Sequence, residues 1–250
     1  MRLAGSIAIV TGASHGIGRA TARAFAVRGA TVVASGLHEQ ELADLAGDIG
    51  GSHLTVDVRD PAHADALVKH AVDRHGRLDV VVVNAGVGHA GPVAEMSAAR
   101  VADLVDINVR APLLLTRAAL PALLDQRSGA IVLVSSIAGR MPVAGEAVYS
   151  ATKAAIEAFA EPLREELRGT GVTVSTVAPG VVATRFFEDR GAPYARRFPR
   201  PLPPEAVAAV IARAAETGAP QSVVPRWLAL PARIHGMAPA TFRRLARRFG

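Results

Sequence analysis

The stretch Thr11-Gly12-Ala13-Ser14-His15-Gly16-Ile17-Gly18 joins an apolar run at 7–10 to a segment of helical periodicity at 17–28. Gly12 permits a tight turn, Gly16 lets the backbone approach a pyrophosphate, and Gly18 allows the helix to pack closely on the strand. The helix N-terminus presents free N–H groups and a favourable dipole to phosphates. The spacing is G-x-x-x-G-x-G, and an ordinary glycine-rich turn is the alternative. The strand before the loop and the helix after it favour a dinucleotide-binding loop.

The rest of the chain continues this alternation of strand and helix. Short β-branched runs lie at 7–10, 31–33, 54–56, 80–83, 131–134 and 172–177, and segments of helical periodicity lie at 17–28, 39–49, 61–75, 97–126 and 149–168. Continuous apolar strands are typical of a parallel sheet that helices cover on both faces. The sequence therefore predicts a single doubly wound Rossmann-type α/β domain over residues 1–250, with about seven strands.

Composition excludes several classes of protein. The chain has 250 residues, of which 50% are hydrophobic and 20% charged, so it can bury a large core and is not disordered. Without cysteine it has no disulfide scaffold, thiolate metal site or cysteine nucleophile. Its eight histidines form no cluster with ligand spacing, so no metal is expected. Apolar runs fall short of the roughly 18 residues of a membrane-spanning helix, and we expect a cytoplasmic protein.

The positive charge is concentrated at the C-terminal end. Residues 1–184 hold 16 basic and 18 acidic side chains, a net of −2, whereas residues 185–250 hold 12 arginines and 4 acids, a net of +8. Any nucleic-acid or membrane contact must therefore depend on this end. It contains no recognised nucleic-acid motif or aromatic stacking platform, so nucleic acid is not an expected partner.

A tyrosine and a lysine stand four residues apart at the start of a predicted helix. Tyr149 and Lys153 therefore lie on one helix face, and the chain has only two tyrosines and two lysines. A nearby ammonium favours the phenolate, so the pair is suited to exchange a proton with a substrate oxygen. The alternative is an exposed lysine beside a half-buried tyrosine. The glycine loop in the same chain favours the catalytic interpretation.

The loop, the Tyr–Lys pair and the chain length together resemble the short-chain dehydrogenase/reductase family. The resemblance covers about residues 5–184, with the motifs in order. It implies that Tyr149 is the general acid/base and that Lys153 lowers the pKa of Tyr149 and binds the nicotinamide ribose. Ser136, thirteen residues before Tyr149, would hold the substrate oxygen, and Asn108 would support a water in the proton relay. For Ser136 and Asn108, a strand-end turn and a local backbone contact are the alternatives.

The same resemblance implies a set of cofactor contacts. Asp57 would lie near the adenine, Asn84-Ala85-Gly86 would border the cofactor, and Pro179-Gly180 with Thr184 would lie beside the nicotinamide amide. The family's motif is Asn-Asn-Ala-Gly, and Val83 replaces its first asparagine, which removes one hydrogen bond. The expected cofactor residues are Gly12, Ser14, His15, Gly16, Ile17, Gly18, Asp57, Val58, Asn84, Ala85, Gly86, Tyr149, Lys153, Pro179, Gly180 and Thr184.

The end of the second strand bears on the choice between NAD and NADP. An acid there would bind the ribose 2′-hydroxyl and repel a 2′-phosphate, and none occurs before Glu39. Gly36 leaves room for a phosphate, but Leu37 stands where members that prefer NADP often carry arginine. His15, His38 and Arg19 are possible substitutes. The sequence favours NADP(H), with NAD(H) as the alternative.

Two segments lie outside the alternating pattern. Residues 185–204 carry five prolines and the aromatics Phe186, Phe187, Tyr194 and Phe198. This composition predicts a lid that covers an apolar substrate pocket. Residues 226–250 form a basic tail with a predicted helix in which Phe242, Leu245 and Phe249 recur between four arginines. Packing of that stripe on the same or a neighbouring subunit is favoured over an anionic membrane or an acidic partner. A homodimer through 97–126 and 149–168 is expected, with a homotetramer as the alternative.

These features predict an NAD(P)-dependent oxidoreductase that interconverts a secondary alcohol and a ketone on a largely apolar small molecule. A 3-oxoacyl-carrier-protein reductase is a variant of this hypothesis, because an arginine-rich tail suits an acidic carrier. A non-catalytic cofactor-binding or membrane-docking protein is the alternative of another class. The set Asn108, Ser136, Tyr149 and Lys153 disfavours it, since a binding protein needs no such set.

Overall fold

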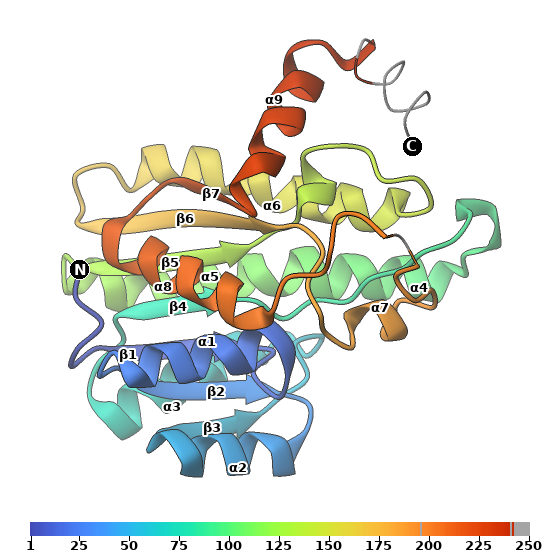
Figure 1. The fold of residues 1–250 in the computed structure, drawn as a ribbon. Helices are drawn as coiled ribbons and strands as arrows, with labels where there is room; N and C mark the ends of the chain where they lie inside the picture. The colour runs from blue at the N-terminus through green and yellow to red at the C-terminus, as the bar shows by residue number, and fades with distance from the viewer. Residues whose placement is uncertain (196, 241, 243–250) are drawn as a thin grey trace.

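The computed structural model describes residues 1–195, 197–240 and 242. Its core is a parallel sheet of seven strands in the order β3-β2-β1-β4-β5-β6-β7 (Figure 1). The strands are β1 (Ile7–Thr11), β2 (Thr31–Gly36), β3 (Ser52–Thr55), β4 (Val80–Val83), β5 (Gly129–Val134), β6 (Val172–Pro179) and β7 (Gln221–Val224). The strand order reverses between β1 and β4, which opens a crevice at the carboxyl ends of these strands. The predicted doubly wound α/β fold is confirmed.

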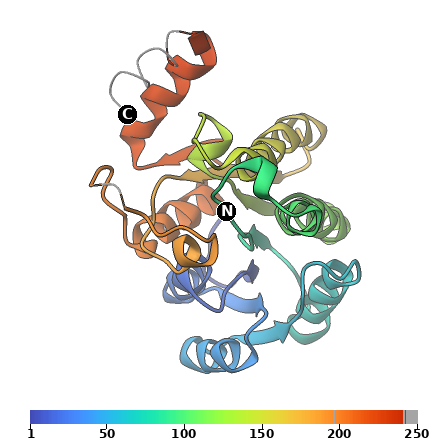
Figure 2. The same cartoon turned by 90° about the vertical axis from the view of Figure 1, so that its right-hand side faces the viewer.

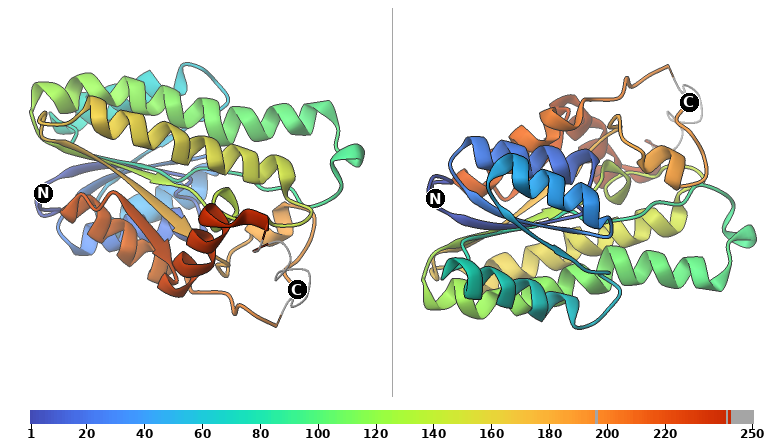
Figure 3. Two further views of the ribbon diagram at one scale, coloured as in Figure 1. Left: turned by 90° about the horizontal axis from the view of Figure 1, so that it is seen from above. Right: turned by 90° about the horizontal axis from the view of Figure 1, so that it is seen from below.

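Helices cover both faces of the sheet (Figure 2). The helices of the described residues are α1 (Gly16–Val27), α2 (Glu39–Ile49), α3 (His63–His75), α4 (Ala98–Val105), α5 (Ala111–Asp125), α6 (Ala147–Glu166), α7 (Phe186–Asp189), α8 (Pro204–Thr217) and α9 (Ala229–Met237). The helices α1, α2 and α8 share one core cluster with the sheet, and α3, α5 and α6 share the other. Seen from above, α5 and α6 run side by side on one face (Figure 3).

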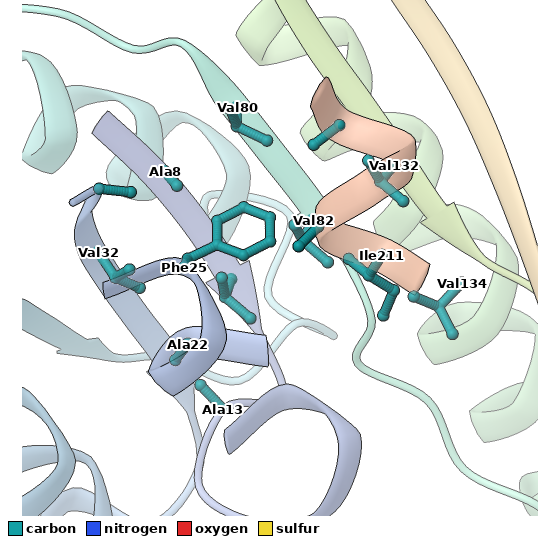
Figure 4. Packing of buried hydrophobic residues seen from close by; sticks show 14 of the residues in the cluster. Ala8, Ala13, Ala22, Phe25, Val32, Val80, Val82, Val132, Val134 and Ile211 are labelled. Carbon is teal, nitrogen blue, oxygen red and sulfur yellow. The ribbon is translucent and has the colours of Figure 1, made fainter. Parts of the chain in front are cut away.

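The first core cluster seats the glycine loop on the sheet. Phe25 of α1 is fully buried among Val80, Val82 and Ile211, which come from β4 and α8 (Figure 4). The burial of a phenylalanine of this kind stabilises the fold by about 2–3 kcal/mol. Because α1 follows the loop directly, this packing fixes the position of the helix N-terminus that faces the crevice.

Several predicted elements have other bounds in the structure, and three of these differences are the most informative. The third strand is Ser52–Thr55 rather than 54–56, because its register on β2 pairs Val33 with Ser52 and Gly36 with Thr55. The last helix predicted, 149–168, begins two residues earlier, so Tyr149 lies inside the first turn of α6. The segment 97–126 is not one α-helix, because a π turn at Asp106–Arg110 separates α4 from α5.

The stretch Ala98–Asp125 has the length and composition of a membrane-spanning helix, which the sequence does not predict. Its side chains Leu115, Ala119 and Leu123 are buried in the second core cluster of this domain. Asp106 and Arg110 form an ion pair in its middle, with the Nε–Oδ1 distance at 2.8 Å. Length and composition are also shared by the core helices of globular domains, and the buried face makes this a core helix.

Candidate active site

The glycine loop lies at the carboxyl end of β1 in a conformation that only glycine adopts easily. Gly12 and Gly16 have φ values of +65° and +57°. A Cβ on Gly18 would come within 2.1 Å of the carbonyl oxygen of Gly12, and one on Gly16 would come within 3.1 Å of Thr184 Cγ2. The loop therefore packs tightly against the start of α1, and Gly16 lies against Thr184. The glycine loop and the segment of Thr184, both predicted to bind the cofactor, are thus in contact.

Thr11 ties the loop to the Asn84-Ala85-Gly86 turn. Its Oγ1 accepts hydrogen bonds from the backbone N–H groups of Asn84 and Ala85, both at 3.0 Å. The Asn84 side chain returns a bond from Nδ2 to the Thr11 carbonyl at 2.9 Å. The sequence did not identify this role of Thr11, although its position at the strand end beside the loop was a usable signal. The two turns form one rigid wall of the crevice.

Asn108 sits in the π turn, fully buried, and fixes the next residue of that wall. Its Oδ1 accepts from the backbone N–H of Val87 at 2.9 Å, and its Nδ2 donates to the Val87 carbonyl at 2.8 Å. Nδ2 also lies 3.1 Å from Thr152 Oγ1 on α6. The side chain thus joins the turn after β4 to the helix that carries Tyr149. Its predicted part in a proton relay stays a prediction.

Tyr149, Lys153 and Ser136 converge at the crevice. Lys153 Nζ lies 5.9 Å from the centre of the Tyr149 ring and donates to the Val134 carbonyl at 3.1 Å. The hydroxyl of Ser136, just beyond β5, forms a hydrogen bond with the Tyr149 hydroxyl. A Cβ on Gly86 would lie 3.3 Å from Lys153 Nζ, so the wall and the pair are in direct contact.

Burial dominates the electrostatics of this pair. It raises the pKa of Tyr149 above its ordinary value, while the bond from Ser136 acts in the opposite direction and the charge of Glu146 adds to the rise. Burial also lowers the pKa of Lys153 to about 8. The resemblance implies that Lys153 lowers the pKa of Tyr149, whereas in the structure burial raises this pKa and Lys153 is not among the groups that shift it. A neutral phenol is the resulting form at neutral pH.

We expect the buried lysine to make stability depend on pH. In the unfolded chain Lys153 stays protonated up to its ordinary pKa of 10.5, whereas in the folded chain it loses its proton from about pH 8. The cost of burying the charge is therefore complete below pH 8 and disappears as the pH rises to 10.5, a change of about 3 kcal/mol. Urea unfolding at pH 7 to 10 measures the gain in stability of Lys153→Met over wild type, which should shrink as the pH rises.

The other lysine of the chain provides the control for this measurement. Lys69 is exposed on α3 and forms an ion pair with Asp73. Lys69→Met should change stability by less than about 1 kcal/mol at every pH. A stability gain for Lys153→Met that stays constant from pH 7 to 10 would show that Lys153 does not lose its proton in this range.

The segment after β6 covers Tyr149. Phe186 of α7 lies with its ring centre 5.4 Å from that of Tyr149, and its ring fills the space over Gly88, where a Cβ would meet it at 2.4 Å. Arg190 places its guanidinium 4.5 Å from the Phe187 ring centre and forms a buried ion pair with Glu146, three residues before Tyr149. The sequence did not identify Glu146 or Arg190. Their pair joins the predicted lid to the helix of Tyr149.

The expected adenine end of the crevice carries a second ion-pair cluster. Asp57 accepts from Arg59 Nη2 at 2.6 Å, and this bond lowers the pKa of the Asp57 carboxyl. Val58 and Ala85 line one small hollow with Thr11, so the turn after β3 reaches the turn after β4. Asp57 and Val58 both follow β3, and Val58 lies beside Thr11 at the carboxyl edge of the sheet.

Basic side chains gather near the end of β2. The rings of His15 and His38 lie 5.7 Å apart, and burial, His38 and Arg185 lower the pKa of His15. Arg19 Nη1 donates to the Ser14 carbonyl at 3.2 Å. The space over Gly36, predicted to be free for a phosphate, holds the Ser14 hydroxyl, because a Cβ on Gly36 would lie 2.6 Å from Ser14 Oγ.

The crevice fits a nicotinamide dinucleotide by its own geometry. Ser14 Oγ is buried without a hydrogen-bond partner among the described residues, in a loop whose glycines leave backbone N–H groups at the start of α1. Such a loop binds phosphates. Pro179 and Gly180 close the far end, where the Gly180 N–H donates to the Val224 carbonyl at 2.7 Å. Within the part of the chain that the structure describes, no group of three or more acids and histidines could hold a metal ion.

A doubly wound sheet with a phosphate-binding loop after β1 and a buried Tyr–Lys pair beside it defines a dinucleotide-dependent oxidoreductase. The chain belongs to the short chain dehydrogenase family, whose model matches residues 6–195. An uncharacterized oxidoreductase of Staphylococcus epidermidis is 36% identical over 184 residues, which cover 73% of this chain and 80% of that protein. A 3-oxoacyl-(acyl-carrier-protein) reductase of Vibrio cholerae is 36% identical over 187 residues, which cover 74% and 76%.

Solved structures agree with this assignment. A short chain dehydrogenase/reductase from Burkholderia phymatum in complex with NAD has a TM-score of 0.86 and 26% identity over 95% of each chain. A short-chain dehydrogenase from Streptomyces avermitilis has a TM-score of 0.83 and 30% identity over 97% of each chain. Family and neighbours support a nicotinamide cofactor for this chain and do not decide between NAD and NADP.

Proposed function

We propose that this oxidoreductase interconverts a ketone and a secondary alcohol with NAD(P)(H). The observation that carries the proposal is the convergence of the half-buried Ser136 with the buried Tyr149 and Lys153, in a cluster that borders the glycine-loop wall. Two hydroxyls that bond to each other are suited to hold one substrate oxygen between them. A protein that only binds a cofactor has no need of this cluster.

Each residue has a defined task in the proposed reaction. Gly12, Gly16 and Gly18 with Ser14 would hold the phosphates, and Lys153 would hold the nicotinamide ribose. When bound, the reduced nicotinamide supplies the hydride that the carbonyl carbon takes up. Ser136 donates a hydrogen bond to the carbonyl oxygen, and Tyr149 transfers its proton to that oxygen, so that the C=O double bond becomes a C–O single bond and new C–H and O–H bonds form.

The electrostatics favour the reductive direction at neutral pH. A general acid must carry its proton when the substrate arrives, and burial raises the pKa of Tyr149. Asn108 supports this arrangement, because it fixes α6 against the turn after β4 through Thr152 and Val87. We propose that water reaches Tyr149 for reprotonation along the side of the cluster that Asn108 and Lys153 form.

The substrate we propose is largely apolar. Tyr149, Phe186, Phe187 and Tyr194 form a chain of edge-on and tilted ring contacts, with centroid distances of 5.4, 5.7 and 5.3 Å along the series. An aromatic wall of this kind suits a lipid-like, steroid-like or aromatic ketone. The relatives named as 3-oxoacyl-(acyl-carrier-protein) reductases support a 3-oxoacyl thioester as the second candidate. Residues 185–204 would act as the lid of this pocket.

For the cofactor we propose NADP(H) over NAD(H). No acid follows β2 before Glu39, and the guanidinium groups of Arg19 and Arg185 lie near Ser14 and His15 at this corner. Cations at this position suit a 2′-phosphate, whereas an acid would repel it. We further propose a cytoplasmic homodimer through the outward sides of α5 and α6, with a homotetramer as the alternative.

One panel tests these proposals together. Nicotinamide absorbance is followed with NADPH and with NADH against apolar ketones, 3-oxoacyl thioesters and small polar keto-sugars. We expect turnover of apolar ketones with NADPH, at a higher kcat/KM than with NADH. Activity confined to polar keto-sugars would exclude the apolar pocket, and cofactor binding without turnover of any substrate would favour the non-catalytic alternative.

A further inference from the structure

A row of large apolar side chains is exposed at the C-terminal end of the described chain. Phe198, Trp227, Leu230 and Met237 are exposed by 68%, 46%, 65% and 88%, and Ile234 by 39%. We call these five residues the apolar ridge. Four of them follow one another at intervals of three or four residues along Arg226–Leu228 and α9, so they lie on one side of the helix. Contiguous exposed apolar surface of this kind marks an interaction site.

The ridge joins two segments into one surface. Phe198, from the irregular segment between α7 and α8, stacks on Trp227 with ring centres 5.3 Å apart and ring planes 25° apart. The helix α9 projects from the rest of the domain beyond the β7 edge of the sheet (Figure 1, Figure 2). On its other side, His235 lies 3.1 Å from the Arg140 carbonyl, so α9 is held to the domain while the ridge faces away from it.

The surroundings of the ridge are basic. Arg197, Arg200, Arg226 and Arg233 are all exposed next to ridge residues in the chain. The sequence has no acidic residue between 190 and 204 or between 217 and 250, and it carries four further arginines at 243, 244, 247 and 248. Aromatic and aliphatic side chains bordered by arginines, with no acids, match the interface of an anionic lipid bilayer.

We propose that the apolar ridge docks this enzyme on anionic membrane surfaces, with the ridge in the headgroup region and the arginines on the lipid charges. A second copy of the chain is a poorer occupant. A two-fold contact would place the arginines of both copies against one another, and the segments between 190 and 204 and between 217 and 250 supply no acid to neutralise them. The proposal is independent of the proposed reaction and concerns residues beyond 195, where the match to the family model ends.

The predicted packing of the tail stripe on the same or a neighbouring subunit stays a prediction. The predicted helix with Phe242, Leu245 and Phe249 lies largely outside the described residues, and of these three only Phe242 is described. Its ring packs on His235 at 5.2 Å. The apolar side chains that α9 and the turn before it expose begin at Trp227, before the predicted helix in the chain. The sequence pattern predicted no helix face at that position.

The only tryptophan of the chain lies in the ridge and reports on docking directly. Full-length protein is mixed with vesicles of phosphatidylcholine, either alone or with an equal part of phosphatidylglycerol. We expect the Trp227 emission to shift to shorter wavelength and the protein to float with the mixed vesicles, and the neutral vesicles to bind at least about tenfold more weakly. Raising NaCl from about 0.05 to about 0.5 M should weaken the binding.

Two pairs of substitutions separate the apolar and the charged part. Leu230→Ser with Met237→Ser should reduce partition by about tenfold or more, and Arg226→Gln with Arg233→Gln by about fivefold for each arginine. The matched controls lie at the C-terminal end of α1, where Val27, its last residue, is 88% exposed and the following Arg28 is exposed. Val27→Ser and Arg28→Gln should leave partition unchanged. Circular dichroism and the melting temperature establish that each variant is folded.

Three results would overturn the proposal. The first is absence of wild-type binding to the anionic vesicles, and the second is partition that the ridge substitutions leave unchanged in folded variants. The third is a dimer, detected by sedimentation without vesicles, that dissociates in the Leu230→Ser, Met237→Ser variant. That result would make the ridge an interface between copies of the chain.

Discussion

Tyr149→Phe is expected to lower kcat for ketone reduction by about 10²- to 10⁴-fold, the usual contribution of a positioned general acid. The variant keeps the ring that stacks on Phe186 but loses the hydroxyl that bonds with Ser136. The proton must then come from water rather than from a positioned phenol. The affinity for the nicotinamide cofactor, measured by fluorescence titration, should change by less than about threefold, because Lys153 and the glycine loop are untouched.

The second tyrosine of the chain supplies the matched control. Tyr194 packs on Phe187, and its hydroxyl donates to the Pro199 carbonyl at 2.9 Å. Tyr194→Phe also removes one hydroxyl from an aromatic stack, at a position without a role in proton transfer. We expect its kcat to stay within about fivefold of wild type. Equal kcat values for Tyr149→Phe and wild type would refute the assignment of Tyr149 as the acid.

Gly18→Ala is expected to destabilise the protein and to weaken cofactor binding. Replacing glycine by alanine inside a helix normally stabilises it by about 1 kcal/mol. Here the new methyl group would lie 2.1 Å from the carbonyl oxygen of Gly12 and 2.8 Å from Asn84 Nδ2. The loop must move to relieve this overlap, so we expect a loss of at least about 2 kcal/mol in unfolding free energy and about tenfold or more in cofactor affinity.

Gly47 provides the opposite case within the same chain. It lies inside α2, and a Cβ there would meet nothing within 4 Å. Gly47→Ala should therefore raise the unfolding free energy by about 0.5–1 kcal/mol and leave cofactor affinity unchanged. Chemical denaturation and cofactor titration of both variants measure the contrast. If Gly18→Ala proves as stable as Gly47→Ala, the loop is not packed on α1 as described.

The sheet and the positions of the motifs could be predicted because both depend on local patterns. Continuous apolar runs predict buried strands. Glycines at the end of the first strand predict the loop without any knowledge of the rest of the fold. The boundaries of β3 could not be predicted in this way. They are set by pairing with β2, and Val56 still bonds to the Gly36 carbonyl at 3.0 Å after the strand ends.

The parts of the site that escaped prediction are pairs distant in sequence. Glu146 and Arg190 are 44 residues apart, and neither belongs to a motif. Their contact depends on how the segment after β6 folds back over α6, which no periodicity encodes. The same holds for Asn108, whose residue type was recognised but whose three bonds to Val87 and Thr152 depend on the π turn.

The π turn at Asp106–Arg110 has a consequence for the phase of the whole helical segment. Each residue advances an α-helix by about 100°, and a π turn holds one residue more than an α turn. The inserted residue lets Asn108 point at Val87 while Leu115 and Ala119 still face the sheet. Removing any one residue here would rotate one half of the segment by more than a quarter of a turn against the other. The spacing between Asn108 and the buried face of α5 therefore cannot change by one residue without uncoupling the cofactor crevice from the core.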